Sequence, residues 1–120
     1  MNAIVAGVHM VPFKKPGQQE PYRVMGAETI LGALKDAGLD SRDIQQAYAS
    51  FCYGDTGAGQ HALYDAFQTG IPVFNVNNAC CSGSSALYLT TTTQGRSPVC
   101  ESCTLESGVP RAQTIAKSNE

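Results

Sequence analysis

The sequence predicts an α/β fold with a mainly parallel sheet covered by helices. Three observations lead to this prediction: segments of strand and helix character alternate, the connections between strand candidates are long enough for parallel crossovers, and two strand candidates are apolar almost throughout. Strands that are apolar on both sides belong to a sheet whose two faces are both covered. We therefore expect helices on both faces of this sheet.

The first half of the chain alternates between the two patterns. Residues 3–9 are apolar and β-prone, and a proline-rich loop ends this expected strand. In residues 24–37 apolar side chains recur at helical spacing, and Gly38 stands where a helix C-cap belongs, so we expect a helix. Residues 47–53 carry aromatic and small side chains that suit a second strand, and residues 61–67 predict one or two helical turns.

The second half begins with a third strand and then changes character. Residues 70–78 predict a strand, with a helix starting near Cys80. Residues 94–120 follow a run of four threonines and are rich in Ser, Thr, Pro and Gly with little periodicity. We therefore expect one folded domain over residues 1–93 and a divergent, poorly ordered tail over residues 94–120.

Composition excludes several classes of function. The chain has 120 residues, eight Lys and Arg scattered among ten Asp and Glu, and a net charge of -2, which fits one soluble domain without the basic stripe of a nucleic-acid binder. The apolar residues 3–13 are too short to span a bilayer and lack the basic start of a signal peptide. Five cysteines without regular spacing indicate reduced thiols. We expect an intracellular protein with no membrane span, no nucleic-acid partner and no targeting signal.

The segment VFNVNNACCSGSSALYL, residues 73–89, places adjacent cysteines between an expected strand and an expected helix. A thiol at a helix N-terminus is close to unsatisfied backbone N–H groups and to the positive end of the helix dipole, which favour the reactive thiolate. Small residues after Cys80 leave room for a substrate carbonyl. Cys80 is therefore the candidate catalytic nucleophile.

Other interpretations of these cysteines stay open at this point. A cysteine in a buried turn usually acts as a small packing residue. A cysteine nucleophile also needs a base, and the only histidines, His9 and His61, are interpreted as a strand-end residue and a loop residue. The spacing of Cys100 and Cys103 is that of a redox pair or of half a zinc site, but the flanking sequence predicts neither. The glycine-rich residues 54–60 lack the Lys-Ser/Thr of a phosphate loop and predict a turn.

Several segments together resemble the thiolase superfamily. NVNNACCSGSSALYL is similar to the family's nucleophile segment, with Cys80 at the nucleophile position, and VAGVHMVPFKKPG, ALKDAGLDSRDIQQAYASFCYGD and GQHALYDAFQTGIPVFNVNN resemble the preceding segments in order. The match covers about residues 3–89 and is most similar to the N-terminal part of thiolases of the sterol-carrier-protein type. The fold class it implies is an incomplete thiolase-like N-terminal half.

The resemblance implies acyl transfer through a cysteine thioester on Cys80. Coenzyme A thioesters, including 3-ketoacyl-CoA, would be substrates, with no separate cofactor and no metal. An acyl-CoA or lipid would be the ligand, the family is typically homodimeric, and its members act in peroxisomes or the cytoplasm.

The sequence departs from the family in two ways. The second half, which supplies an activating His, an Asn-bearing loop and a second cysteine, is missing, and the pattern ends after Leu89. We therefore expect a truncated, spliced or frame-shifted product that is inactive alone; the alternatives are a non-catalytic fragment with a binding role and a CxxC redox or zinc protein. Ala79 stands where relatives often have Asn, and Cys81, where they have Ala or Ser, has the potential to oxidise or to form a strained disulfide with Cys80.

Overall fold

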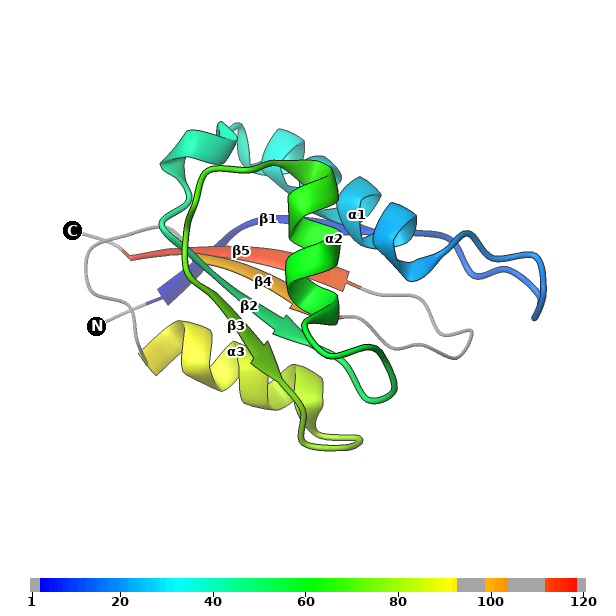
Figure 1. Cartoon of the computed structure of the whole chain (residues 1–120). Coiled ribbons are helices and arrows are strands. Elements are labelled where there is room, and N and C mark those ends of the chain that lie inside the picture. Colours follow the sequence, from blue (N-terminus) through cyan, green and yellow to red (C-terminus); the bar gives the residue numbers. More distant parts are fainter. Residues whose placement is uncertain (1–2, 93–98, 104–111, 119–120) are drawn as a thin grey trace.

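A five-stranded sheet with helices on both faces forms the centre of the structure (Figure 1). It is described here from a computed structural model over residues 3–92, 99–103 and 112–118. The elements in chain order are β1 (Ala3–Met10), α1 (Tyr22–Ala37), the short 3-10 helix η1 (Ser41–Asp43), β2 (Gln46–Ser50), α2 (Ala58–Ala66), β3 (Val73–Val76), α3 (Ser82–Thr92), β4 (Val99–Cys103) and β5 (Ala112–Ser118).

The strand order in the sheet is β1-β5-β4-β2-β3. The strand β2 pairs in parallel with both β3 and β4, whereas β5 pairs antiparallel with both β1 and β4. The predicted α/β class with parallel pairing is thus confirmed, and the two antiparallel pairings were not foreseen. Every strand and helix expected between residues 3 and 92 is present.

Two strands lie within residues 94–120, where the sequence predicted none. The strand β4 lies inside the sheet, between β2 and β5, and β5 separates it from β1. Paired neighbours supply the hydrogen bonds of both strands, so weak local patterning is no obstacle to strand formation. The sequence-based prediction therefore missed these two strands, while the division of the chain at residue 93 and the poorly ordered tail stay predictions.

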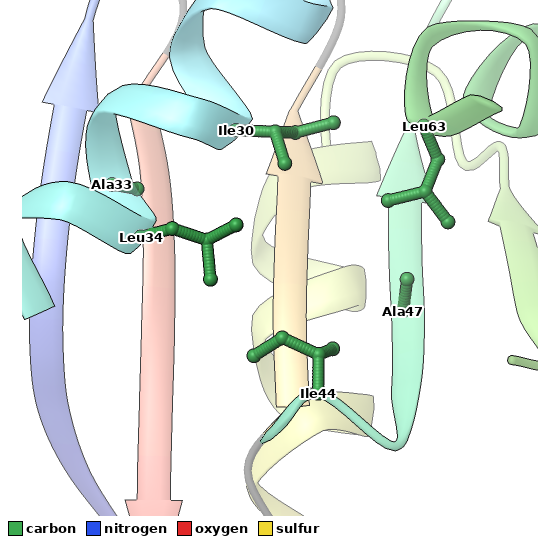
Figure 2. Packing of buried hydrophobic residues seen from close by; sticks show 6 residues of the cluster. All are labelled: Ile30, Ala33, Leu34, Ile44, Ala47 and Leu63. Carbon is green, nitrogen blue, oxygen red and sulfur yellow. The ribbon is translucent and has the colours of Figure 1, made fainter. Parts of the chain in front are cut away.

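The larger cluster of buried side chains lies between the sheet and the helices α1 and α2 (Figure 2). Its members are Ile30, Ala33, Leu34, Ile44, Ala47 and Leu63. On the opposite face of the sheet Tyr48 packs with Ala86 of α3. Because Ala47 and Tyr48 are consecutive in β2, they point to opposite faces. The expectation that helices cover both faces is confirmed for β2.

Helices cover only one face of β1, which forms one edge of the sheet: α1 packs on that face. Val5, Val8 and Met10 are each more than half exposed, because α3 packs on β2, β3 and β4. The first strand is therefore only half buried, although its sequence predicted a buried strand. Within the described part of the chain, no helix has both the length and the apolar character needed to cross a membrane.

Candidate active site

A tight turn joins the end of β3 to the start of α3 and carries Cys80 (Figure 1). We call residues 77–82 the cysteine turn. Cys80 and Cys81 are both exposed and both are free thiols. Because neither side chain fills space in the core, packing does not explain the two cysteines.

Backbone hydrogen bonds give the cysteine turn its shape. The N–H of Cys81 donates to the carbonyl of Asn78 over 3.0 Å, and the N–H of Ser82 donates to the carbonyl of Ala79 over 3.1 Å. A bond of helical spacing then runs from Ser85 N–H to the carbonyl of Cys81, at 2.9 Å. The chain therefore passes directly from the turn into α3, and Cys80 lies two residues before the helix, as the sequence predicted.

Asparagine and serine side chains reinforce the turn. Asn77 Oδ1 accepts the N–H of Ala79 at 3.2 Å, a bond typical of an Asx turn. Asn78 donates from Nδ2 to Ser85 Oγ at 3.0 Å. Ser82 Oγ accepts the N–H of Asn78 at 2.8 Å and donates to the carbonyl of Ala79 at 2.7 Å. All of these groups are neutral, so the turn offers polar contacts without fixed charge.

One member of this network comes from a distant part of the chain. Cys52, just after β2, lies with its Sγ 2.7 Å from the carbonyl oxygen of Ala79, and its own carbonyl accepts Nδ2 of Asn77 at 3.1 Å. Sequence reasoning placed Cys52 only in a strand. The asparagines and serines of the turn carry a recognisable turn pattern, but nothing local to Cys52 indicates a partner 27 residues away.

Neither histidine of the chain forms a hydrogen bond with the cysteine turn. His61 lies on α2, where its Nδ1 is 3.1 Å from the hydroxyl of Tyr22. The imidazole of His9 occupies the space that a Cβ at Gly32 of α1 would need. Both histidines are therefore engaged with α1. The interpretation of His61 as a loop residue is wrong, because it lies inside α2.

The structure also shows where the other candidate sites from the sequence lie. Residues 52–53 form a bend and residues 56–57 form a turn in which Gly57 has a positive φ of 76°. The predicted turn over residues 54–60 is therefore wrong for residues 58–60, which begin α2. Cys100 and Cys103 both lie on the strand β4 and not at the start of a helix. Their side chains are outside the part of the chain described, so the redox and zinc interpretations stay predictions. Among the described residues, no three His, Cys, Asp or Glu side chains are grouped closely enough to hold a metal ion.

No family model matches the chain. Among curated proteins, it is 48% identical over 87 residues to non-specific lipid-transfer protein-like 2 of Caenorhabditis elegans, a match that covers 71% of this chain and 21% of that protein. It is 41% identical over 90 residues to sterol carrier protein 2 of Gallus gallus, covering 73% of this chain and 16% of that protein. The chain therefore matches about a fifth of the length of these relatives, or less.

Several solved structures share this fold. One is the 3-oxoacyl-[acyl-carrier-protein] synthase III of Aquifex aeolicus VF5, with a TM-score of 0.75 and 12% identity, over 99% of this chain and 55% of that one. Another is the acyltransferase ChlB3, with a TM-score of 0.81 and 9% identity, over 100% of this chain and 51% of that one. At such identities the likeness concerns the fold alone, and it is the fold of thiolases and ketosynthases. The chain is thus a thiolase-fold homologue of sterol carrier protein 2 and of non-specific lipid-transfer protein-like 2.

Proposed function

We propose that Cys80 accepts an acyl group from a coenzyme A thioester, which is the first half of a thiolase-type acyl transfer. The observation that carries the proposal is the exposed thiol of Cys80, two residues before α3. Backbone N–H groups at a helix start stabilise the oxyanion that forms when a thiolate attacks a carbonyl. The fold, and the names synthase and acyltransferase of two structural neighbours, support the same chemistry.

The acyl-accepting step needs few groups. The Cys80 thiolate attacks the thioester carbonyl, a new S–C bond forms, and the C–S bond to coenzyme A breaks as coenzyme A leaves as a thiolate. Cleavage of a 3-ketoacyl-CoA is more demanding, because the carbon–carbon bond breaks and the departing acetyl-CoA carbanion must receive a proton. The described cysteine turn holds only neutral hydrogen-bonding groups and no histidine. This chain is therefore proposed to accept acyl groups without completing that cleavage alone.

Lipid binding without catalysis is the second candidate. The names of the relatives, lipid-transfer protein and sterol carrier protein, support a lipid or long-chain acyl ligand. Homodimerisation and a location in peroxisomes or the cytoplasm are proposals that rest on the same family resemblance.

Intact-protein mass spectrometry after incubation with an acyl-CoA separates the two candidates. We expect wild type to gain one acyl group that hydroxylamine removes, and Cys80→Ser to gain none. Cys81→Ser is the matched control, because Cys81 is also exposed and lies one residue away, and it should still be acylated. A folded wild-type chain without an adduct, or an adduct that persists in Cys80→Ser, would contradict the nucleophile assignment. Lipid binding would then be the remaining candidate.

A further inference from the structure

The carbonyl of Ala79 receives more hydrogen-bond donors than any other group described in the cysteine turn. The thiol of Cys52 and the hydroxyl of Ser82 each lie 2.7 Å from it, and the N–H of Ser82 lies 3.1 Å from it. This carbonyl belongs to the peptide that joins Ala79 to Cys80. Because the peptide is planar and trans, the direction of the carbonyl fixes the opposite direction of the Cys80 N–H. Hydrogen bonds donated to the Ala79 carbonyl therefore also orient the backbone N–H of Cys80.

The backbone of Ala79 makes these donors necessary. Its φ is +47°, and no other described residue apart from glycines has a positive φ. The left-handed region is on the order of tenfold less populated for an L-residue than the right-handed one, because Cβ approaches the following carbonyl. Ala79 is exposed, so packing does not hold it in place. Hydrogen bonds to its peptide groups must offset the unfavourable conformation.

Cys52 differs from the other donors in its origin. Ser82 belongs to the turn itself, whereas Cys52 follows β2 and is partly buried. Its carbonyl also holds Asn77 Nδ2, so this one residue contacts both ends of the Asn77–Ala79 segment. Since β2 and β3 pair in parallel, their carboxyl ends lie at the same edge of the sheet, and Cys52 connects the strand β2 to the turn after β3.

We propose that Cys52 is a positioning residue for Cys80: its thiol donates to the Ala79 carbonyl, holds the left-handed turn, and so keeps the Cys80 thiol at the start of α3. The proposal rests on the function proposed above, because it assigns Cys52 a part in preparing the same nucleophile. A thiol is a weak donor, so its effect is expected to be modest. Loss of this hydrogen bond should still be measurable, because the conformation of Ala79 that it stabilises is intrinsically unfavourable.

The test compares Cys52→Ala, which removes the donor, with Cys52→Ser, which keeps one of similar size. The rate at which iodoacetamide alkylates Cys80 is measured by peptide mass spectrometry across the pH range in which thiols ionise, and urea denaturation gives the folded fraction used to correct each rate. We expect Cys52→Ala to react about fivefold more slowly, the effect of one net hydrogen bond, and Cys52→Ser to stay within about twofold of wild type.

A second variant separates positioning from loss of fold. Ala79→Gly removes the cost of the positive φ, so the turn should no longer depend on Cys52. We expect the double variant Cys52→Ala with Ala79→Gly to react as fast as Ala79→Gly alone. Cys52→Ala at the wild-type rate, Cys52→Ser as slow as Cys52→Ala, or a double variant that stays slow would each overturn the proposal.

The acylation assay is run on the same variants to separate the two proposals. If alkylation follows the expected order but no variant, wild type included, forms an acyl adduct, the positioning role of Cys52 stands and the acyl-accepting function fails. If acyl adducts form at equal rates in Cys52→Ala and wild type, with equal alkylation, the function stands and the positioning role fails.

Discussion

Ala79→Gly should stabilise the protein, although glycine substitutions usually do the opposite. A left-handed conformation costs an L-residue roughly 1–2 kcal/mol, and Ala79 has a φ of +47°. Glycine relieves that cost but loses about 0.5–1 kcal/mol through the greater freedom of the unfolded chain. The side chain of Ala79 is exposed, so its removal creates no cavity. We expect a net gain of about 0.5–1 kcal/mol in the free energy of unfolding.

Urea denaturation of wild type and variant measures this gain as a higher midpoint at an unchanged slope. Ala27→Gly is the matched control, because it makes the same substitution inside the helix α1. There glycine should cost about 1 kcal/mol, so the two variants are expected to shift in opposite directions. If Ala79→Gly lowers the midpoint as Ala27→Gly does, the left-handed conformation of Ala79 does not cost the free energy inferred from its φ.

Two further predictions concern other parts of the chain. Gly59→Ala should destabilise by about 2 kcal/mol in urea denaturation, because a Cβ at Gly59 would overlap that of Ala49 and lie 2.8 Å from Asn75 Oδ1; an unchanged midpoint would refute this packing. Hydrogen bonds from Arg42 lower the pKa of Asp40 to about 2, so folding favours the ionised carboxylate. Its small contribution is present above the unfolded pKa of about 4 and is lost as the pH falls toward 2. Asp40→Asn, which keeps the helix cap, should therefore show a smaller loss of stability in acid than wild type, and an equal loss in both would contradict this pKa.

Local sequence patterns predicted the elements up to residue 92 because the forces that place them are local or periodic. The helix α1 shows this most clearly: apolar side chains recur on one face, and Gly38 ends the helix with a φ of 65° and donates to the carbonyls of Leu34 and Lys35. The strands β4 and β5 have no comparable pattern. Their pairing with β2 and β1 joins segments about 50 and 110 residues apart, respectively, and no local rule predicts such partners.

The candidate site was likewise predictable from the sequence only in part. The position of Cys80 before a helix follows from the order of an apolar strand, two asparagines and a run of small residues, all within one stretch of chain. The role of Cys52 depends on a contact between the ends of two parallel strands, and the left-handed conformation of Ala79 contradicts the usual preference of alanine. Departures from local preference are expected at functional sites, where the surrounding contacts hold the conformation.

In the proposed function, the acceptance of an acyl group and its later release need different groups. Acceptance requires a thiol held in an ordered backbone, and the cysteine turn supplies both from residues of this chain. Release to a second substrate, or cleavage of a carbon–carbon bond, requires a group that moves a proton. Both histidines are engaged with α1, on the face of the sheet opposite α3. We therefore propose a division of the chemistry: the turn after β3 presents the nucleophile, and neither His9 nor His61 contacts this turn to move the proton of the later steps.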